Sequence, residues 1–293
     1  MTIAADYLLL DVFTDRQFAG NQLAIFPEAS FDDATMQRIA RELNLSETVF
    51  LSRVDAGAVA ALRIFTPDRE IPFAGHPSVG TAIALRQRLR WPRSQEASFA
   101  LKLRIGHVAI AIDPGEPVVA WLTTPPVTFG REIAREDAAA LAGLGVADVR
   151  GDLPSQLVGA GSPFLYVPLA SKGAVDRAAL DVSTVRAQLG WDELNGVYLF
   201  AQTETGAYAR MFAPMSGIAE DPATGGATGP LYAYLARHGA LARRDRFSNE
   251  QGIAMGRPSL LHVRLHWAED APDKIEVGGS AVFVGEGRLH VSV

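Results

Sequence analysis

The sequence of 293 residues lacks cysteine, an excess of basic residues and any long apolar run. Without cysteine the chain has no disulfide, thiolate metal site or thiol nucleophile. Its net charge of -6 and pI of about 5.6 argue against a nucleic-acid-binding surface, which needs Lys and Arg to neutralise phosphates. No stretch approaches the ~20 apolar residues of a membrane span, and no secretion signal is visible. We therefore expect a cytoplasmic protein without nucleic-acid or membrane partners.

Two segments of the chain resemble each other. RIFTP at 63–67 recurs as RMFAP at 210–214, with Ile71 and Ile218 following, and each copy then enters a glycine turn, AGHPSVGT at 74–81 and DPATGGATG at 221–229. A second pair, AGNQLAIFP at 19–27 and AGSPFLYVP at 160–168, keeps the same order. Offsets of nearly half the chain indicate duplication of a whole domain, not a solenoid of short repeats.

Short apolar runs bounded by Gly, Pro and Asp recur through both halves and predict strands. They lie at 7–13, 23–26, 48–52, 59–65, 99–103, 108–112, 118–122, 164–167, 197–201, 208–212, 260–266 and 281–284. Gly285-Glu286-Gly287 then predicts a hairpin turn with a returning strand.

Helical patterns are few. One is predicted at 32–43, begun by a Ser30–Asp33 capping box, with Met36, Ile39, Ala40 and Leu43 as its buried stripe. The others start at the glycine turns, at about 77–89 and 229–237, with Pro77 and Pro230 in their first turns.

The pattern predicts an α+β fold of two pseudo-symmetric domains, each mostly strand with one helix launched from a glycine turn. We place the domains at 1–126 and 127–280, because LTTPP at 122–126 is the best boundary, and the segment 281–293 is a candidate to return to the first domain.

A glycine turn that opens a helix presents unpaired N–H groups and the positive end of a dipole. Two such turns facing each other across an interdomain cleft would clamp one anion. Taken singly, each turn is better explained as a tight connection.

Three polar residues have the chemistry of an active site: His76 and Asp221 lie in the two turns, and Glu47 lies where a helix gives way to a strand. His76 can donate to a substrate oxygen or carry a proton, Glu47 can act as a general acid or base if it is buried, and Asp221 precedes Pro222 in the second turn. The alternatives are a structural histidine donor, a capping or surface glutamate, and an aspartate N-cap.

Other features of the sequence give weaker evidence of a functional site. His262 and His266 share a face of one strand, which solvent exposure explains better than a metal. No dinucleotide-binding glycine motif, P-loop or nucleophile elbow is present, so we expect no cofactor and no metal.

Five ordered motifs resemble those of the phenazine-biosynthesis isomerase family, the PhzF-like proteins. They are DVFTDRQFAGN at 11–21, LSETVF at 45–50, FAGHP at 73–77, EDPATG at 220–225, and EQG at 250–252 with GRPS at 256–259 and VGGSAV at 277–282. The resemblance implies a diaminopimelate epimerase-like fold, with a barrel-like, mostly antiparallel sheet around a central helix in each domain.

The resemblance also implies cofactor-free proton transfer in a small cyclic amino acid carboxylate by a homodimer. Glu47 is then the acid-base residue, and His76 and Asp221 bind and polarise the substrate. Asn21, Ser46, Gly75, Gly225 and Gly226 are the further substrate-binding residues it implies.

Two features separate this chain from its apparent relatives. Related epimerases and racemases of the fold use one thiol per half, which this chain cannot supply. The phenazine enzymes carry Ser where this chain has Gly226, so their substrate, trans-2,3-dihydro-3-hydroxyanthranilate, is not carried over at this point.

The leading hypothesis is a cofactor-independent isomerase that shifts a proton or double bond in a small carboxylate by general acid-base catalysis. One alternative is an amino-acid epimerase using Glu47 and Asp221 as its bases. Another is a metabolite-binding protein of the same fold without turnover.

Overall fold

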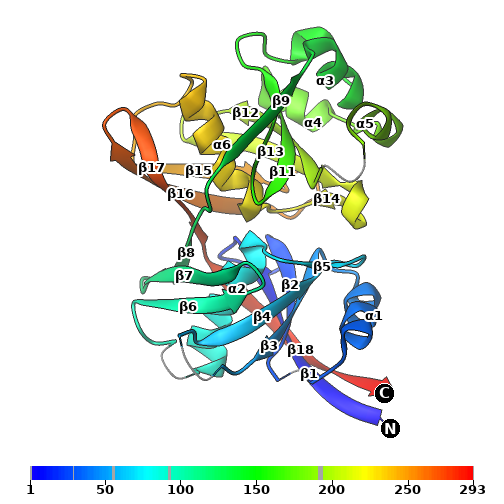
Figure 1. The fold of residues 1–293 in the computed structure, drawn as a ribbon, viewed down its shortest axis with the longest axis vertical. Coiled ribbons are helices and arrows are strands. Elements are labelled where there is room, and N and C mark those ends of the chain that lie inside the picture. Colours follow the sequence, from blue (N-terminus) through cyan, green and yellow to red (C-terminus); the bar gives the residue numbers. More distant parts are fainter. Residues whose placement is uncertain (1, 29, 55–56, 92–93, 191–193, 293) are drawn as a thin grey trace. The chain divides into compact units, whose positions relative to one another are not determined.

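The computed structural model describes residues 2–28, 30–54, 57–91, 94–190 and 194–292. The chain forms two compact units, each described by itself below (Figure 1). Unit 1 comprises Met1–Thr123 and Gly278–Val293, and unit 2 comprises Thr124–Val277. Sheet dominates both units, so the predicted α+β class is confirmed. No helix in the described part of the chain is long and apolar enough to cross a membrane.

Unit 1 is a sheet with two helices. Its strands are β1 (Thr2–Val12), β2 (Asn21–Phe26), β3 (Glu47–Ser52), β4 (Ala60–Phe65), β5 (Glu70–Ile71), β6 (Ser98–Leu103), β7 (Gly106–Asp113), β8 (Val119–Thr123) and β18 (Ala281–Ser292). Its helices are α1 (Asp33–Leu43) and α2 (Gly75–Ala84), the latter continued by a π-helical turn at Leu85–Leu89.

Among its described residues, unit 2 has a similar content of strands and four α-helices. Its strands are β9 (Thr128–Ile133), β10 (Ser155–Ala160), β11 (Ser162–Pro168), β12 (Gly196–Gln202), β13 (Gly206–Ala213), β14 (Ile218–Asp221), β15 (Arg246–Gln251) and β16 (Ser259–Ala268), and β17 (Ala271–Gly279) begins here and ends in unit 1. Its helices are α3 (Arg135–Leu141), α4 (Lys172–Arg177), α5 (Val182–Leu189) and α6 (Gly225–Arg237).

The two units repeat one strand order. In unit 1, β2 and β3 are parallel, β3 and β4 antiparallel, β4 and β6 parallel, and β6 and β7 antiparallel. In unit 2, β11, β12, β13, β15 and β16 repeat those four pairings in the same sequence. In each unit the helix that opens at a glycine turn, α2 or α6, follows a short strand, β5 or β14. That short strand pairs with β4 in unit 1 and with β13 in unit 2. The duplication inferred from two short motifs therefore extends over the whole unit.

An ion pair is duplicated with the strands. Arg63 on β4 donates to both oxygens of Glu70 at 2.9 and 2.7 Å, and Arg210 on β13 donates to both oxygens of Glu220 at 2.8 and 2.8 Å. A guanidinium that binds a carboxylate through two donors fixes direction as well as distance. Each pair thus locks the hairpin that leads into the glycine-turn helix.

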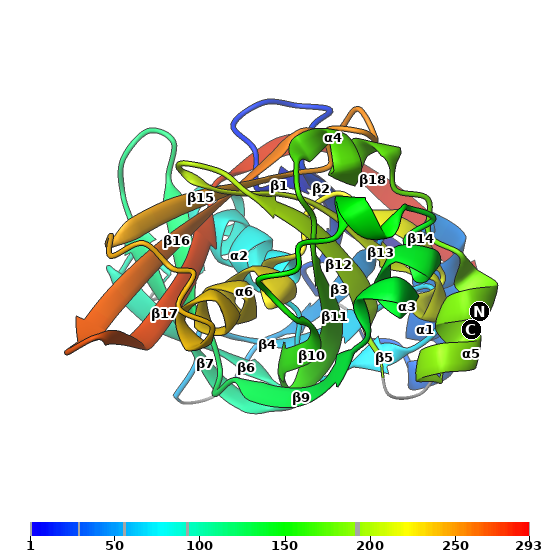
Figure 2. The ribbon, with the colours of Figure 1, turned by 90° about the horizontal axis from the view of Figure 1, so that it is seen from above.

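The glycine-turn helices form the centre of their units. Every residue of α2 is buried, and α2 contacts β1, β2, β3, β8 and β18. Most of α6 is buried too, and it contacts β10 and β16 (Figure 2). Small residues suit this position, because a helix enclosed by sheet on most sides leaves little room for side chains. At Gly80, for example, an added Cβ would lie 2.6 Å from Val12 and 2.7 Å from Leu23.

Both central helices begin earlier than the sequence predicts. α2 starts at Gly75, two residues before Pro77, and α6 starts at Gly225, so Pro230 lies inside the helix and not in its first turn. Proline removes the backbone donor that would bond the carbonyl four residues back. The predicted helix start at Pro230 was wrong, because the packing of α6 against β10 and β16 stabilises the helix despite the missing bond.

The predicted helix at 32–43 is present, but its cap differs from the prediction. Asp32 is the N-cap, and its carboxylate accepts a hydrogen bond from the Thr35 N–H at 2.8 Å. The Ser30–Asp33 capping box is therefore wrong, and Asp33 instead forms an ion pair with Arg63 at 2.6 Å. Met36, Ile39 and Ala40 of the predicted stripe are buried against Phe26, Phe50 and Phe65.

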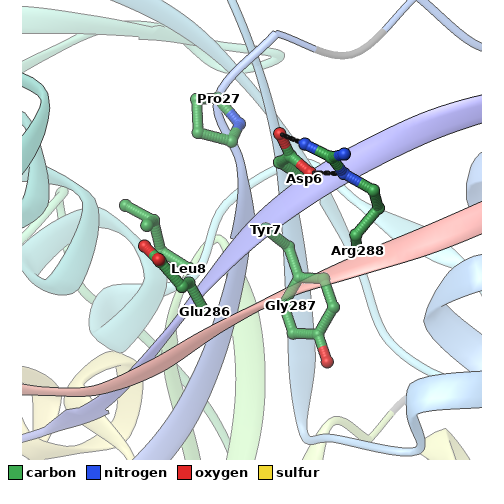
Figure 3. A pocket seen from close by; sticks show the side chains of 7 residues that line it. All are labelled: Asp6, Tyr7, Leu8, Pro27, Glu286, Gly287 and Arg288. Carbon is green, nitrogen blue, oxygen red and sulfur yellow. Dashed lines mark hydrogen bonds and ion pairs between the residues drawn. The ribbon is translucent and has the colours of Figure 1, made fainter.

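The predicted hairpin at 285–287 is wrong. β18 continues through these glycines and pairs along its length with β1, from Val12↔Ala281 to Thr2↔Ser292. Gly287 pairs with Tyr7, and an added Cβ there would lie 2.6 Å from the Tyr7 ring, so the glycine provides room for the aromatic ring. Arg288 Nη2 donates to Asp6 Oδ2 at 2.9 Å across these two strands. Both residues line a hollow of about 460 Å³, and Figure 3 shows the side chains around it.

Candidate functional site

Three polar residues of unit 1 converge at the start of α2. Asn21 begins β2, Glu47 begins β3, and β2 and β3 are adjacent parallel strands, so their first residues share one sheet edge. His76 is the second residue of α2. We call Asn21, Glu47 and His76 the unit 1 cluster. Glu47 and His76 were predicted as catalytic residues, and the structure brings them together.

The unit 1 cluster is buried and tightly spaced. His76 Nδ1 lies 3.2 Å from Glu47 Oε2 and 3.3 Å from Asn21 Nδ2. The side chains of His76 and Glu47 are 4% and 13% exposed, so water contributes little to their interaction. Low polarity strengthens this contact relative to a surface pair.

Burial lowers the pKa of His76 to about 3, because the imidazolium would lose its hydration. The ring is therefore neutral at ordinary pH. A neutral Nδ1 either carries a proton and donates to Glu47, or carries a lone pair and accepts from Asn21. His76 can thus follow the protonation of Glu47 without gaining a charge.

The other ring nitrogen of His76 has a different environment. Nε2 is buried and has no hydrogen-bond partner among the described residues. A buried polar atom without a partner costs about 1–3 kcal/mol. Such an atom in a polar cluster is well suited to bind a ligand.

A second set of polar residues lies at the start of α6 in unit 2. Asp221 ends β14, Thr224 is the residue before α6, and Gln251 ends β15; we call them the unit 2 cluster. Asp221 is not the N-cap that the sequence allowed, because Thr224 occupies that position. The Thr224 hydroxyl donates to Asp221 Oδ2 at 2.6 Å. Asp221 and Thr224 are 4% and 9% exposed.

The remaining predicted residues lie beside these clusters. Ser46 is half-buried directly before Glu47, and Gly75 opens α2 next to His76. Gly225 and Gly226 are the first two residues of α6, where backbone N–H groups have no intrahelical acceptor. Around Gly226 an added Cβ would meet nothing within 4 Å.

Thr224 and Gln251 were not predicted as site residues. Both lie within motifs that the sequence displays, EDPATG and EQG, but nothing in their spacing shows that β14 and β15 end together. That proximity comes from the pairing of β13 with both β14 and β15.

The duplicated register shows which residues occupy equivalent positions. Glu47 is opposite Leu23, and Gly196 is opposite Phe164, so Gly196 is the counterpart of Glu47. At Gly196 an added Cβ would lie 2.7 Å from Met211 Sδ and 2.9 Å from the Phe212 carbonyl oxygen. Unit 2 therefore has no side chain, and no room for one, where unit 1 has its glutamate.

The helix starts and the short strands give two further counterparts. Gly75 and Gly225 both open a helix, so His76 corresponds to Gly226. Ile71 is opposite Ile64 in unit 1, and Asp221 is opposite Met211 in unit 2. The counterpart of Ile71 is therefore Asp221 and not Ile218. The sequence alignment of Ile71 with Ile218 is corrected accordingly.

His262 and His266 have different side-chain partners, and His262 Nδ1 lies 3.1 Å from Ser248 Oγ. His266 Nε2 contacts Glu276 Oε2 at 2.8 Å, a carboxylate partner that the sequence spacing did not reveal, and Lys274 lies 2.7 Å from the same carboxylate. Among the described residues no group of three or more His, Cys, Asp or Glu is placed to hold a metal ion.

Known proteins resemble this chain over almost its whole length. The model of the family described as phenazine biosynthesis-like protein matches residues 10–287. The trans-2,3-dihydro-3-hydroxyanthranilate isomerase of Pseudomonas chlororaphis is 35% identical over 285 residues, which cover 97% of this chain and 98% of that protein.

Solved structures resemble the fold of this chain over almost its whole length. The PhzF-family phenazine biosynthesis protein of Bacillus anthracis has a TM-score of 0.88 and 25% identity, covering 99% of this chain and 100% of the other. A predicted epimerase of Pseudomonas aeruginosa has a TM-score of 0.81 and 32% identity, covering 98% and 100%.

Proposed function

The chain belongs to the phenazine biosynthesis-like protein family and is an isomerase, and we propose that it shifts a proton and a double bond in a small cyclic amino- or hydroxy-carboxylate. In this proposal Glu47 takes a proton from one carbon and returns it to another while the electron pair moves along the ring. The atoms and charges balance without a cofactor, because substrate and product have the same composition.

The contact between Glu47 and a neutral, buried His76 carries the proposal. A general acid-base residue needs a partner that accommodates both of its protonation states. His76 Nδ1 lies 3.2 Å from the carboxylate, within reach of a hydrogen bond that it could donate to the ionised form and accept from the acid. When Nδ1 carries the ring proton, Nε2 has the lone pair and can accept from a substrate hydroxyl or amino group.

The unit 2 cluster supports a binding role for Asp221. Its Oδ2 already accepts from Thr224 at 2.6 Å, and a carboxylate held by a hydroxyl is a fixed acceptor for a substrate amino or hydroxyl group. The N–H groups at the starts of α2 and α6 favour a carboxylate ligand.

The epimerase alternative requires a second base. Gly196, the counterpart of Glu47, has no space for a side chain, and Asp221 is engaged with Thr224. These observations favour a single base and hence an isomerisation. A binding protein without turnover has support only from Gly226, whose missing hydroxyl removes a potential ligand contact.

The test uses trans-2,3-dihydro-3-hydroxyanthranilate, the substrate named for the Pseudomonas relative, in deuterated buffer. We expect turnover by the wild-type protein, with deuterium at the carbon that receives the proton to the extent that Glu47 exchanges with solvent. Binding of this compound without any turnover would support the binding-protein alternative. A product that differs only in the configuration of one carbon would support the epimerase.

We also propose a homodimer, on the basis of the family resemblance. Light scattering of the purified protein would then give twice the 31.4 kDa of one chain. A single-chain mass at micromolar concentration would contradict the dimer and leave the proposed reaction untouched.

A further inference from the structure

Gln251 lies behind the unit 2 cluster and connects its members. It ends β15 and is fully buried. Its Nε2 donates to the Asp221 carbonyl oxygen at 2.8 Å and to Thr224 Oγ1 at 2.9 Å, while its Oε1 accepts from the Thr224 N–H at 3.2 Å. One side chain therefore fixes the backbone of both residues and the hydroxyl between them.

These contacts determine the orientation of the amide. A backbone N–H can only donate and a carbonyl oxygen can only accept, so Oε1 must face Thr224 N and Nε2 must face the Asp221 carbonyl. Thr224 Oγ1 then accepts from Nε2, and its own proton is directed to Asp221 Oδ2 at 2.6 Å. The hydrogen bonds run in one direction, from Gln251 through Thr224 to the Asp221 carboxylate.

The segment after Gln251 strengthens this arrangement. Gly252 has φ +74, and an added Cβ there would lie 2.7 Å from the Pro222 carbonyl oxygen and 2.3 Å from that of Arg257. The end of β15 therefore packs directly on the 221–224 turn, and the amide has little freedom to leave its position.

We propose that Gln251 is a positioning residue that, through the Thr224 hydroxyl, orients the Asp221 carboxylate for substrate binding. This inference rests on the proposed function of Asp221. Thr224 acts as the relay: its hydroxyl accepts from Gln251 and donates its one proton to Asp221. Loss of either group leaves Asp221 present but no longer held in this orientation.

The decisive variants keep shape and change hydrogen bonding. In Thr224→Val and Gln251→Met we expect kcat/KM for trans-2,3-dihydro-3-hydroxyanthranilate to fall about 10–100-fold, mostly through KM. Thr224→Ser retains the hydroxyl and should stay within about threefold of wild type. Gln156→Met is the matched control, because Gln156 is a buried glutamine of unit 2 that bonds Gly130 and His238 instead.

The outcomes separate a positioning role from a structural one. An unchanged KM in Thr224→Val, or equal losses in Thr224→Ser and Thr224→Val, would overturn the relay. A loss in Gln156→Met as large as in Gln251→Met would show that the effect is general destabilisation.

A second measurement covers the case in which the wild-type protein does not turn over this compound, so that the proposed function fails. Hydrogen exchange of the peptide containing 221–224 should accelerate in Gln251→Met and not in Gln156→Met. Equal exchange in both variants would contradict the positioning role independently of any activity.

Discussion

The unit 1 and unit 2 clusters both lie at the start of a central helix in two copies of one scaffold, yet they use different positions of that scaffold. Unit 1 has Glu47 and His76 where unit 2 has Gly196 and Gly226, and unit 2 has Asp221 where unit 1 has Ile71. What the copies retain is structural, as in the Arg63–Glu70 and Arg210–Glu220 pairs. Duplication thus preserved the turns and helix starts, while the polar side chains diverged to a glutamate and a histidine in one unit and an aspartate in the other.

The largest expected effect tests whether unit 1 alone supplies the base. Glu47→Gln keeps the shape and removes the proton acceptor, so kcat should fall ~10²–10⁴-fold. Steady-state rates with trans-2,3-dihydro-3-hydroxyanthranilate measure this, with Glu42→Gln, an exposed carboxylate on α1, as the control. Activity within tenfold of wild type would remove Glu47 from the chemistry.

The next effect tests whether unit 2 has lost the space for a base. Gly196→Ala places a methyl group 2.7 Å from Met211 Sδ, and overpacking of this kind costs about 1–3 kcal/mol of unfolding free energy. Urea denaturation measures it against Gly285→Ala, where an added Cβ meets nothing within 4 Å. Equal midpoints for the two variants would show that Gly196 is not sterically required.

A pH-dependent effect tests the neutral state of His76. Its folded pKa of about 3 lies below the ordinary value of 6.5, so the unfolded chain binds more protons between these values and the folded state weakens as pH falls below 6.5. Between pH 7.5 and 5 the wild type should lose about 2 kcal/mol more than His76→Asn, at 1.36 kcal/mol per pH unit. Parallel losses in urea titrations would contradict the buried neutral ring.

The smallest effect concerns Gly226, the counterpart of His76. Gly226→Ser enters open space and should change stability by less than about 0.5 kcal/mol. If its hydroxyl binds substrate, turnover of trans-2,3-dihydro-3-hydroxyanthranilate rises, by up to about tenfold for one hydrogen bond. Thermal melts and initial rates give the two quantities, and a variant with unaltered stability and lower turnover would assign Gly226 a different role.

Periodicity and turn chemistry predicted most strands and the glycine-turn helices, because alternation and helix stripes are local properties. Contacts between segments that are far apart in the sequence could not be predicted from these local patterns. Gly285 and Gly287 look like a turn, but they are extended because β1 lies alongside them. The cap of α1 is Asp32, because its carboxylate accepts from the Thr35 N–H.

The candidate site shows the same limit. Glu47, His76 and Asp221 could be named because each lies in a sequence motif, His76 and Asp221 in the glycine turns and Glu47 in LSETVF. Gln251 could not, because its role depends on β14 and β15 ending together beside α6. A residue that acts by holding another has no signature of its own in a single sequence.

The pairing of β18 with β1 also has a consequence for biosynthesis. Unit 2 is one continuous stretch, whereas unit 1 is built from two segments with unit 2 between them in the sequence. Unit 1 needs β18 against β1, so its first strand keeps an unpaired edge until β18 has been synthesised. Unit 1, which carries Glu47, can therefore complete its sheet only after all of unit 2 has been synthesised.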